Sequence, residues 1–424
     1  MSSTQRRVFI TGIGPITAIG TGNDDFRAGL RAGVSPIKRI DRFDPSPFRS
    51  QVAAQIDDFD PLAWMAPKMA RQLDRFSQFG LIAGQLALAD AGLRPGEDGG
   101  ASPERIGIYL GSALGGIVFA EEQHERYLER GIKAVAPNLA LAVFGGAAPA
   151  NLGIALGVRG PILSTANSCA SGAVAIGEAL GAIRAGDIDA AVAGGVEVTL
   201  SPLAFGAFDI IRALSDRHND DPAHACRPFD VDRDGFVMGE GATLLVLEAE
   251  DVARARGAEP YAEVMGYAAT SDAFHMVQPR ADGREAGRAA SEALVDAGVA
   301  AGEIDWVSAH ASSTPLGDIA EAWAIALALG ERAATVPVSA TKALYGHPLG
   351  ASGAIEAAIC ALAVRDGWVP GSANLETVDP DIAAILPGLL RDRDDRAGTY
   401  RRILSTSFGF GGLNAGLVIG AVDG

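Results

Sequence analysis

The sequence predicts a layered α/β protein, and three observations lead to this prediction. Apolar runs rich in β-branched residues alternate with stretches of helical periodicity along the chain. The chain has 424 residues, of which 48% are hydrophobic, so it can bury a large interior. A segment near the middle of the chain is also echoed in the second half.

The first half contains short predicted strands around one long predicted helix. The helix covers 74–91, where apolar residues recur at helical spacing. Several of the strands run into glycine, as buried strands commonly do before a turn. The strands are expected over 7–12, 106–110, 190–193 and 243–247.

The second half repeats this alternation and ends in a predicted hairpin. The hairpin begins at 403–405, continues through FGFGG and returns through AGLVIGAV. The preceding elements are expected as a strand over 261–267, a helix over 287–297, a strand over 306–309 and a helix over 317–329.

The echo joins CASGAVAIGEALGAI, which begins at Cys169, to GASGAIEAAICALAV, which begins at Gly350. Both segments share Ala-Ser-Gly-Ala, at 170–173 and 351–354, and both follow a strand-like run. Alanine and glycine are abundant here, so the echo by itself leaves duplication open. It fits two equivalent halves that meet near 250–258.

Composition excludes several classes of protein. A net charge of −17 argues against nucleic-acid binding, which needs a basic surface. No apolar run is long enough to span a membrane, and the start MSSTQRRVFITGIG lacks the apolar core of a secretion signal, so we expect a cytoplasmic protein. Three widely spaced cysteines argue against a disulfide framework or a structural zinc site.

Cys169 lies where a strand-like run gives way to a helix. The positive end of a helix dipole lowers the pKa of a thiol, so this position favours a reactive cysteine. A buried cysteine that packs the start of the helix explains the position equally well.

Two of the six histidines lie in similar settings, between a strand-like run and a helix. His310 follows WVSA and precedes ASSTPLGD, and His347 follows VPVSATKALYG. A single histidine at a strand end usually has no catalytic role. Two of them together with Cys169 favour nucleophilic catalysis.

Seven motifs in order and spacing identify a resemblance that runs almost end to end. They are RVFITGIGPITAIG, GSALGG, the Cys169 segment, RPFDVDRDGFVMGEGA at 227–242, AHASSTPLGD at 309–318, K-x3-GH-x2-GASGA-x-E at 342–356, and SFGFGGLN at 407–414. The chain resembles the elongating β-ketoacyl-acyl-carrier-protein synthases of the thiolase-like superfamily, which include type II polyketide ketosynthases. This resemblance implies two duplicated α/β halves, 1–255 and 256–424, in a five-layered αβαβα core.

The resemblance also implies the chemistry. Cys169 would accept an acyl group from a carrier-protein thioester. His310 and His347 would hold a malonyl thioester, assist its decarboxylation and stabilise the enolate. Lys342 and Glu356 would organise the histidines.

Further roles follow from the same resemblance. The backbone N–H groups of Cys169 and Phe408 would form the oxyanion hole, and the Phe408 ring would gate the acyl pocket. Ser312 and Thr314 would meet the pantetheine arm. Residues at the pocket floor and at the carrier-protein docking surface would be Leu114, Lys68, Arg71 and Arg217.

The implied partners are an acyl carrier protein and a second subunit, either an identical one or a chain-length-factor-like one. No free cofactor, metal or flavin is expected, because the substrates are carried on the phosphopantetheine group of the acyl carrier protein. The alternatives fit the residues less well. A chain-length factor lacks the nucleophilic cysteine. A thiolase uses a second cysteine as a base, but Cys360 is expected within a helix and not in a glycine-rich loop. An initiating synthase has asparagine in place of one of the two histidines.

Some positions depart from the usual family pattern. His310 is followed by ASST, His347 by proline, and FGFGG by leucine, while Asn167 and Ser168 precede the nucleophile. These departures favour a specialised polyketide or polyene pathway over housekeeping fatty acid elongation, which remains the alternative.

Overall fold

The computed structural model describes residues 5–97 and 101–423. Most of its strands belong to one large mixed sheet, and two small two-stranded sheets lie apart from it. The strands are β1 Val8–Thr17, β2 Gly20–Thr21, β3 Lys38–Arg39, β4 Val52–Ala53, β5 Ile106–Gly111, β6 Ile162–Thr165, β7 Ala190–Glu197, β8 Gly241–Ala249, β9 Ala262–Ser271, β10 Trp306–Ser308, β11 Val338–Ser339, β12 Trp368–Val369, β13 Arg396–Ala397, β14 Arg402–Gly409 and β15 Leu413–Gly420.

The helices connect these strands and cover the sheet. They are α1 Asn23–Ala32, α2 Pro67–Gln72, α3 Arg75–Ala91, α4 Ile117–Arg130, α5 Leu139–Ala142, α6 Ala147–Leu156, α7 Ser171–Ala185, α8 Pro202–Ile210, α9 Glu250–Ala255, α10 Arg284–Ala297, α11 Pro315–Leu329, α12 Ser352–Asp366 and α13 Pro380–Ala383. The predicted strands and helices are therefore present, most of them longer than predicted.

The order of the main sheet repeats one arrangement twice. Its path is β11-β10-β14-β15-β9-β1-β8-β7-β5-β6. Counted inward from the edge strand β6, the strands of the first half follow the order β6-β5-β7-β8-β1. In chain order these are the third, second, fourth, fifth and first strands of that half. Counted inward from the other edge strand, β11, the strands of the second half follow the order β11-β10-β14-β15-β9, which is again third, second, fourth, fifth and first. This repeat supports duplication, while the boundary between 1–255 and 256–424 stays a prediction.

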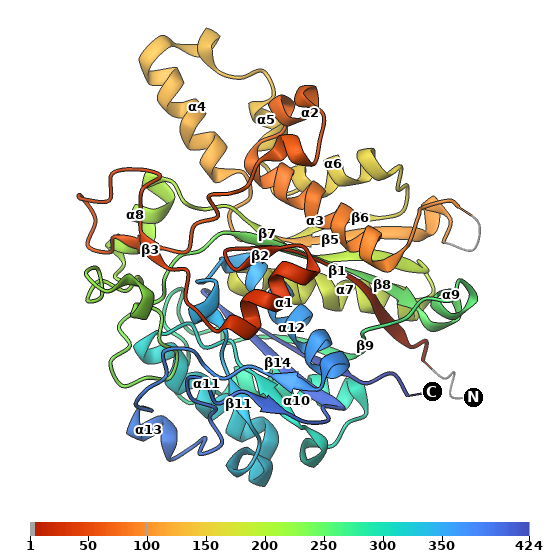
Figure 1. Ribbon diagram of the computed structural model, residues 1–424, viewed down its shortest axis with the longest axis vertical. Coiled ribbons are helices and arrows are strands. Elements are labelled where there is room, and N and C mark those ends of the chain that lie inside the picture. Colours follow the sequence, from red (N-terminus) through yellow and green to blue (C-terminus); the bar gives the residue numbers. More distant parts are fainter. Residues whose placement is uncertain (1–4, 98–100, 424) are drawn as a thin grey trace.

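The two halves stack into the five layers that the resemblance implied. Helices α3 and α6 cover the outer face of the first half, and α10 and α11 cover that of the second. Helices α7 and α12 pack against each other between the two halves, inside the largest apolar core. Figure 1 shows α3 and α6 above, α7 and α12 in the middle, and α10 and α11 below.

The shared Ala-Ser-Gly-Ala segments lie where the two central helices meet. A Cβ placed on Gly172 would lie 2.8 Å from the carbonyl oxygen of Gly350, and one on Gly353 would lie 3.0 Å from the backbone nitrogen of Ala173. Only small residues permit this approach. The echo thus has a structural reason: it brings the starts of α7 and α12, and the loops before them, together.

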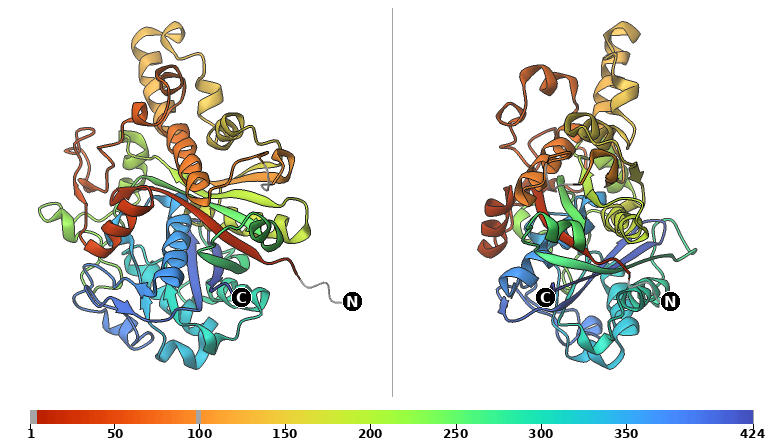
Figure 2. Two further views of the ribbon diagram at one scale, coloured as in Figure 1. Left: turned by 45° about the vertical axis from the view of Figure 1, so that its right-hand side comes forward. Right: turned by 90° about the vertical axis from the view of Figure 1, so that its right-hand side faces the viewer.

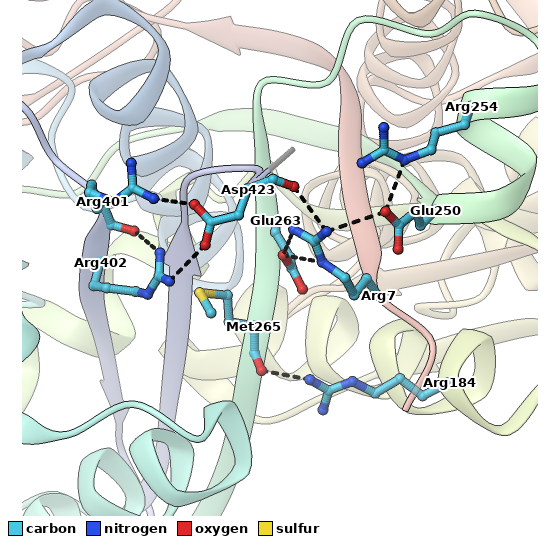
Figure 3. A network of polar contacts seen from close by, with 9 residues as sticks. All are labelled: Arg7, Arg184, Glu250, Arg254, Glu263, Met265, Arg401, Arg402 and Asp423. Carbon is cyan, nitrogen blue, oxygen red and sulfur yellow. Dashed lines mark hydrogen bonds and ion pairs between the residues drawn. The ribbon is translucent and has the colours of Figure 1, made fainter. Parts of the chain in front are cut away.

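A polar network holds the seam between the halves, where β1 pairs with β9. Arg7 donates to Glu263 on β9 at 2.7 Å, to Glu250 on α9 at 3.2 Å, and to the backbone oxygen of Asp423 at 3.1 Å. Figure 3 shows Asp423 reaching Arg401 and Arg402 in turn. The segments around Arg7 and Asp423 are thereby held together.

One segment leaves this layered body. Helix α4 projects from it in all three views of Figures 1 and 2. No α4 helix was predicted from the sequence. Within residues 5–97 and 101–423, no helix has the length and apolar character needed to cross a membrane.

Candidate active site

Three strand-to-helix connections bring the predicted catalytic residues together. Cys169 lies in the 3₁₀ turn Ser168–Ala170 between β6 and α7. His310 follows β10 and precedes α11, and His347 lies between β11 and α12. The thiol sulfur of Cys169 is 3.1 Å from Nε2 of His347. The imidazole rings of His310 and His347 lie 5.3 Å apart between centroids.

The Cys169 thiol is protonated at rest. Burial raises its pKa to about 11, although a contact with the Ser168 hydroxyl and the charge of Lys342 lower it. The expectation that the helix start lowers this pKa is therefore wrong in direction, because desolvation of the thiolate outweighs the favourable contacts. A base must remove the thiol proton, and Nε2 of His347 is placed to do so.

Both histidines are neutral. Burial lowers the pKa of His310 and of His347 well below the ordinary value, and the positive charge of Lys342 lowers both further. Lys342 Nζ lies 3.3 Å from Nδ1 of His310. An ammonium group only donates, so Nδ1 of His310 accepts and its Nε2 carries the proton.

Lys342 is fully buried and pairs with the carboxylate of Glu356 on α12. Its ammonium donates to Glu356 and to the backbone oxygen of His310. Burial raises the pKa of Glu356 to about 7, while Lys342 opposes this rise. The pair thus ties the His310 loop to α12, and its role in organising the histidines stays a prediction.

A second buried carboxylate, not singled out in the sequence, supports the His310 loop. Glu321 on α11 accepts the backbone N–H groups of His310 and Ala311, at 2.8 and 2.6 Å, and the Thr406 hydroxyl at 2.6 Å. Burial raises its pKa to about 7. A glutamate within a helix carries no sequence signal for this role.

Glu197, at the end of β7, is another buried carboxylate that accepts backbone N–H groups, here from the loops of the GSALGG turn and of Gly350. It accepts the N–H groups of Ala113 and Leu114 in the GSALGG turn and that of Gly350 before α12, at 2.6, 3.1 and 2.9 Å. It also accepts the Ser112 hydroxyl at 3.0 Å. This carboxylate fastens the turn that carries Leu114 to the loop that leads into α12.

A cavity of about 370 Å³ leads to these groups. Its lining includes Cys169, His310 and His347, and both Ser312 and Thr314. The two hydroxyls lie 3.4 Å apart. They therefore line the same cavity as the thiol, and their contact with a pantetheine arm stays a prediction.

Leu114 is half-buried and packs against an apolar cluster that contains Cys169. Phe205, Phe236 and Met238 belong to the same cluster. This surrounding is apolar, as a pocket for an acyl chain requires.

The two phenylalanines of FGFGG have different positions. Phe408 pairs with Asn414 in the β14–β15 ladder, and its ring lies 6.1 Å from that of His310. Phe410 lies beyond the end of β14, its backbone N–H contacts the Cys169 sulfur, and its ring packs in the cluster around Leu114. The N–H donor and gate assigned to Phe408 are better matched by Phe410, two residues further on.

The predicted docking residues are all exposed. Lys68 and Arg71 lie on α2, and Arg217 lies in the loop after α8. Arg217 therefore lies on a different element from the other two, and the docking surface stays a prediction. No group of three or more histidine, cysteine or acidic side chains suited to a metal occurs among the described residues.

A thiol beside two neutral imidazoles, on a duplicated five-layered fold, defines the condensing enzymes of the thiolase-like class. Residues 5–253 match the family described as "Beta-ketoacyl synthase, N-terminal domain", and residues 261–376 match its "C-terminal domain". The chain therefore belongs to the β-ketoacyl synthase family of acyltransferases.

Full-length relatives agree with this family. The chain is 41% identical over 414 residues to the 3-oxoacyl-[acyl-carrier-protein] synthase 2 of Synechocystis sp., with 97% of each chain covered. It matches a structure of the ishigamide ketosynthase/chain length factor with a TM-score of 0.90 and 33% identity, covering 99% of this chain and 100% of that one. It also matches a structure of a type II polyketide acyl-carrier protein in complex with its ketosynthase, with a TM-score of 0.89, 30% identity and the same coverage.

Proposed function

We propose that the protein extends an acyl chain on Cys169 by two carbons, through decarboxylative condensation with malonyl-acyl-carrier protein. The observation that carries this proposal is the 3.1 Å contact between the Cys169 sulfur and Nε2 of His347, with the neutral His310 beside it. The thiol supplies the nucleophile, and the imidazoles supply a base and an N–H donor at the same point.

In the first half-reaction, the Cys169 sulfur attacks the thioester carbonyl of an acyl-carrier protein while His347 Nε2 takes the thiol proton. The C–S bond to the carrier arm breaks. The departing thiolate receives the proton from His347, which leaves an acyl-cysteine and a free carrier thiol. The backbone N–H groups of Cys169 and Phe410 support the oxyanion.

In the second half-reaction, the malonyl thioester oxygen lies against the Nε2–H of His310. It also lies against the Nε2–H of His347, after exchange with solvent has moved the proton of that neutral ring from Nδ1 to Nε2. The C–C bond to the malonyl carboxylate breaks and carbon dioxide leaves. The electron pair of the broken bond forms the enolate, which these N–H groups stabilise. The enolate carbon attacks the acyl carbonyl of Cys169. The C–S bond breaks, and the Cys169 thiolate takes a proton from solvent, which releases hydroxide to the bulk solution.

Carrier-protein delivery fits the shape of the cavity. Ser312 and Thr314 line the passage, and the reacting carbon would arrive at its inner end. The structural relative bound to a carrier protein supports this mode of delivery. Exposed Lys68, Arg71 and Arg217 would provide local positive charge on an otherwise acidic protein.

The proposal includes a second subunit. Strand β6 ends the main sheet, and Ile162 and Leu163 on it are 39% and 48% exposed. Exposed Ile154 on α6 and Leu141 on α5 extend this apolar surface beside it. An unpaired edge strand with apolar side chains favours pairing with another chain, in a homodimer or with a chain-length-factor-like subunit.

We place the reaction in a specialised polyketide or polyene pathway. Asn167, Ser168, Pro348 and Leu413 depart from the usual pattern around the nucleophile, and two structural relatives are a ketosynthase/chain length factor and a polyketide ketosynthase. Fatty acid elongation is the second candidate, favoured by the 41% identity to a 3-oxoacyl-[acyl-carrier-protein] synthase 2.

The test is to incubate the protein with malonyl-carrier protein and a panel of acyl-carrier proteins, read by mass spectrometry, with Cys169→Ala as the matched control. A β-ketoacyl product two carbons longer, together with carbon dioxide, supports the proposal. Preference for unsaturated or β-keto chains supports the specialised pathway, whereas preference for saturated chains supports fatty acid elongation. Absence of any extended product with every donor would refute the proposed function.

A further inference from the structure

One polar contact in the site involves a residue with no role assigned so far. Ser352, the first residue of α12, is fully buried, and its hydroxyl oxygen lies 2.8 Å from Nδ1 of His347. The other ring nitrogen of His347 faces the Cys169 sulfur. Ser352 therefore contacts the proposed base on the side away from the substrate.

The duplicated fold shows that this contact is not a routine helix cap. Ser171 holds the equivalent position at the start of α7, in the other Ala-Ser-Gly-Ala segment. Its hydroxyl accepts the backbone N–H of Asn167 at 2.8 Å and donates to the backbone oxygen of Ser168 at 2.6 Å. At Ser352, the hydroxyl contacts the imidazole instead.

A hydroxyl partner gives His347 a freedom that His310 lacks. Nδ1 of His310 faces the Lys342 ammonium, which can only donate, so a proton on that nitrogen is excluded. The Ser352 hydroxyl both donates and accepts, by rotation of one O–H bond. It can therefore face Nδ1 of His347 whether or not that nitrogen carries a proton.

We propose that Ser352 is a positioning residue that enables His347 to hold a second proton, and so to act as the base for Cys169. This inference rests on the first half-reaction of the proposed function. The thiol proton moves to Nε2, and Nδ1–H donates to the Ser352 oxygen while the imidazolium exists. The proton on Nε2 then passes to the departing carrier thiolate, which returns His347 to its neutral form.

The experiment measures alkylation of Cys169 by iodoacetamide against pH, read by intact mass, because this reaction needs no carrier protein. The resting thiol is protonated, so its rate near neutral pH reports on the base. In Ser352→Ala we expect the rate at pH 7.5 to fall roughly 10- to 100-fold, the value of a hydrogen bond to a charged group. The variant should recover as the pH approaches 11, where the thiol ionises by itself.

Two controls separate this role from a structural one. Ser77→Ala removes another buried hydroxyl, on α3, that does not line the cavity, and should leave the pH profile unchanged. Ser352→Ala added to His347→Gln should cause no further loss, because the serine acts through the histidine. Urea unfolding confirms that each variant is folded.

An unchanged pH profile in Ser352→Ala, or an equal further loss in the His347→Gln background, would overturn the inference. The proposed function has a separate readout, which is condensation with malonyl-carrier protein by the wild-type protein. Failure of condensation with an altered alkylation profile would refute the function and keep the role of Ser352. Condensation by the wild-type protein, together with an unaltered alkylation profile in Ser352→Ala, would support the function and refute the role of Ser352.

Discussion

Replacing Lys342 by methionine would remove the charge that links the His310 loop to α12. Both Lys342 and Glu356 are fully buried, so the variant leaves a carboxylate without its partner in the core. Removing one member of a buried ion pair costs about 3–5 kcal/mol of stability. The same change frees Nδ1 of His310, so its Nε2 no longer has to carry the proton.

The loss should depend on pH, and its sign follows from Glu356. The pKa of Glu356 is about 7 in the folded protein against an ordinary value of 4.5, and it rises further without Lys342. The folded variant then keeps a proton that the unfolded chain releases, so its stability falls as the pH rises above 4.5. The wild-type protein shows the same fall up to about pH 7, where its own Glu356 ionises, so the extra loss in the variant develops above pH 7. We expect the loss to be roughly 1 kcal/mol larger at pH 8 than at pH 5.5.

Urea unfolding at these two pH values measures the loss, and carbon dioxide release from malonyl-carrier protein measures the chemistry. We expect decarboxylation to fall at least about 10-fold, the effect of misplacing one N–H donor. The double variant Lys342→Met/Glu356→Gln removes the unpaired charge and should recover much of the stability at pH 8 but not the decarboxylation. Equal stability losses at both pH values, or wild-type decarboxylation, would refute this reasoning.

Three further predictions concern other parts of the fold. Glu321→Gln places an amide N–H₂ against N–H donors and should cost about 1–3 kcal/mol of stability. The raised pKa of Glu321 makes the wild-type protein less stable as the pH rises from 4.5 to about 7, so the urea midpoint should vary less with pH in this variant. A urea midpoint that varies with pH as much as in the wild type would contradict this prediction. Leu163→Glu puts a charge on the exposed edge strand and should give monomers on gel filtration, whereas an intact dimer would exclude this edge as the interface. Glu263→Gln should weaken the seam between the halves by about 1 kcal/mol, measured as a lower urea midpoint, because Arg7 is partly exposed and its ion pair is screened by solvent; an unchanged midpoint would show that this ion pair contributes little.

Much of the fold could be predicted from the sequence, because buried strands and amphipathic helices have distinct periods. The Ala-Ser-Gly-Ala echo by itself left duplication open, because the repeated strand order is visible only in the sheet. Helix α4 was missed since it projects from the body and lacks an extensive buried face.

The proposed catalytic residues Cys169, His310 and His347 could be picked out because they are reactive residue types at strand-to-helix connections, and the structure brings them together. The supporting carboxylates could not, because Glu197 and Glu321 resemble ordinary residues of a strand and a helix until tertiary contacts surround them. The residues of FGFGG likewise do not reveal that β14 ends at Gly409, which places Phe408 within the strand and Phe410 beyond it.

The sign of the Cys169 pKa shift was also beyond the sequence. The start of α7 was visible as a helix dipole, which favours the thiolate. The apolar cluster around the sulfur is assembled from segments far apart in the chain, and its desolvation effect is the larger one.

The acyl-enzyme intermediate tests the central claim most directly. After brief mixing with an acyl-carrier protein, intact mass followed by peptide mapping should place one acyl group on Cys169. Cys226 and Cys360 should stay free, since burial raises the pKa of each to about 12 and neither lines the cavity. An acyl group on another residue, or an adduct retained in Cys169→Ala, would contradict the assignment of the nucleophile.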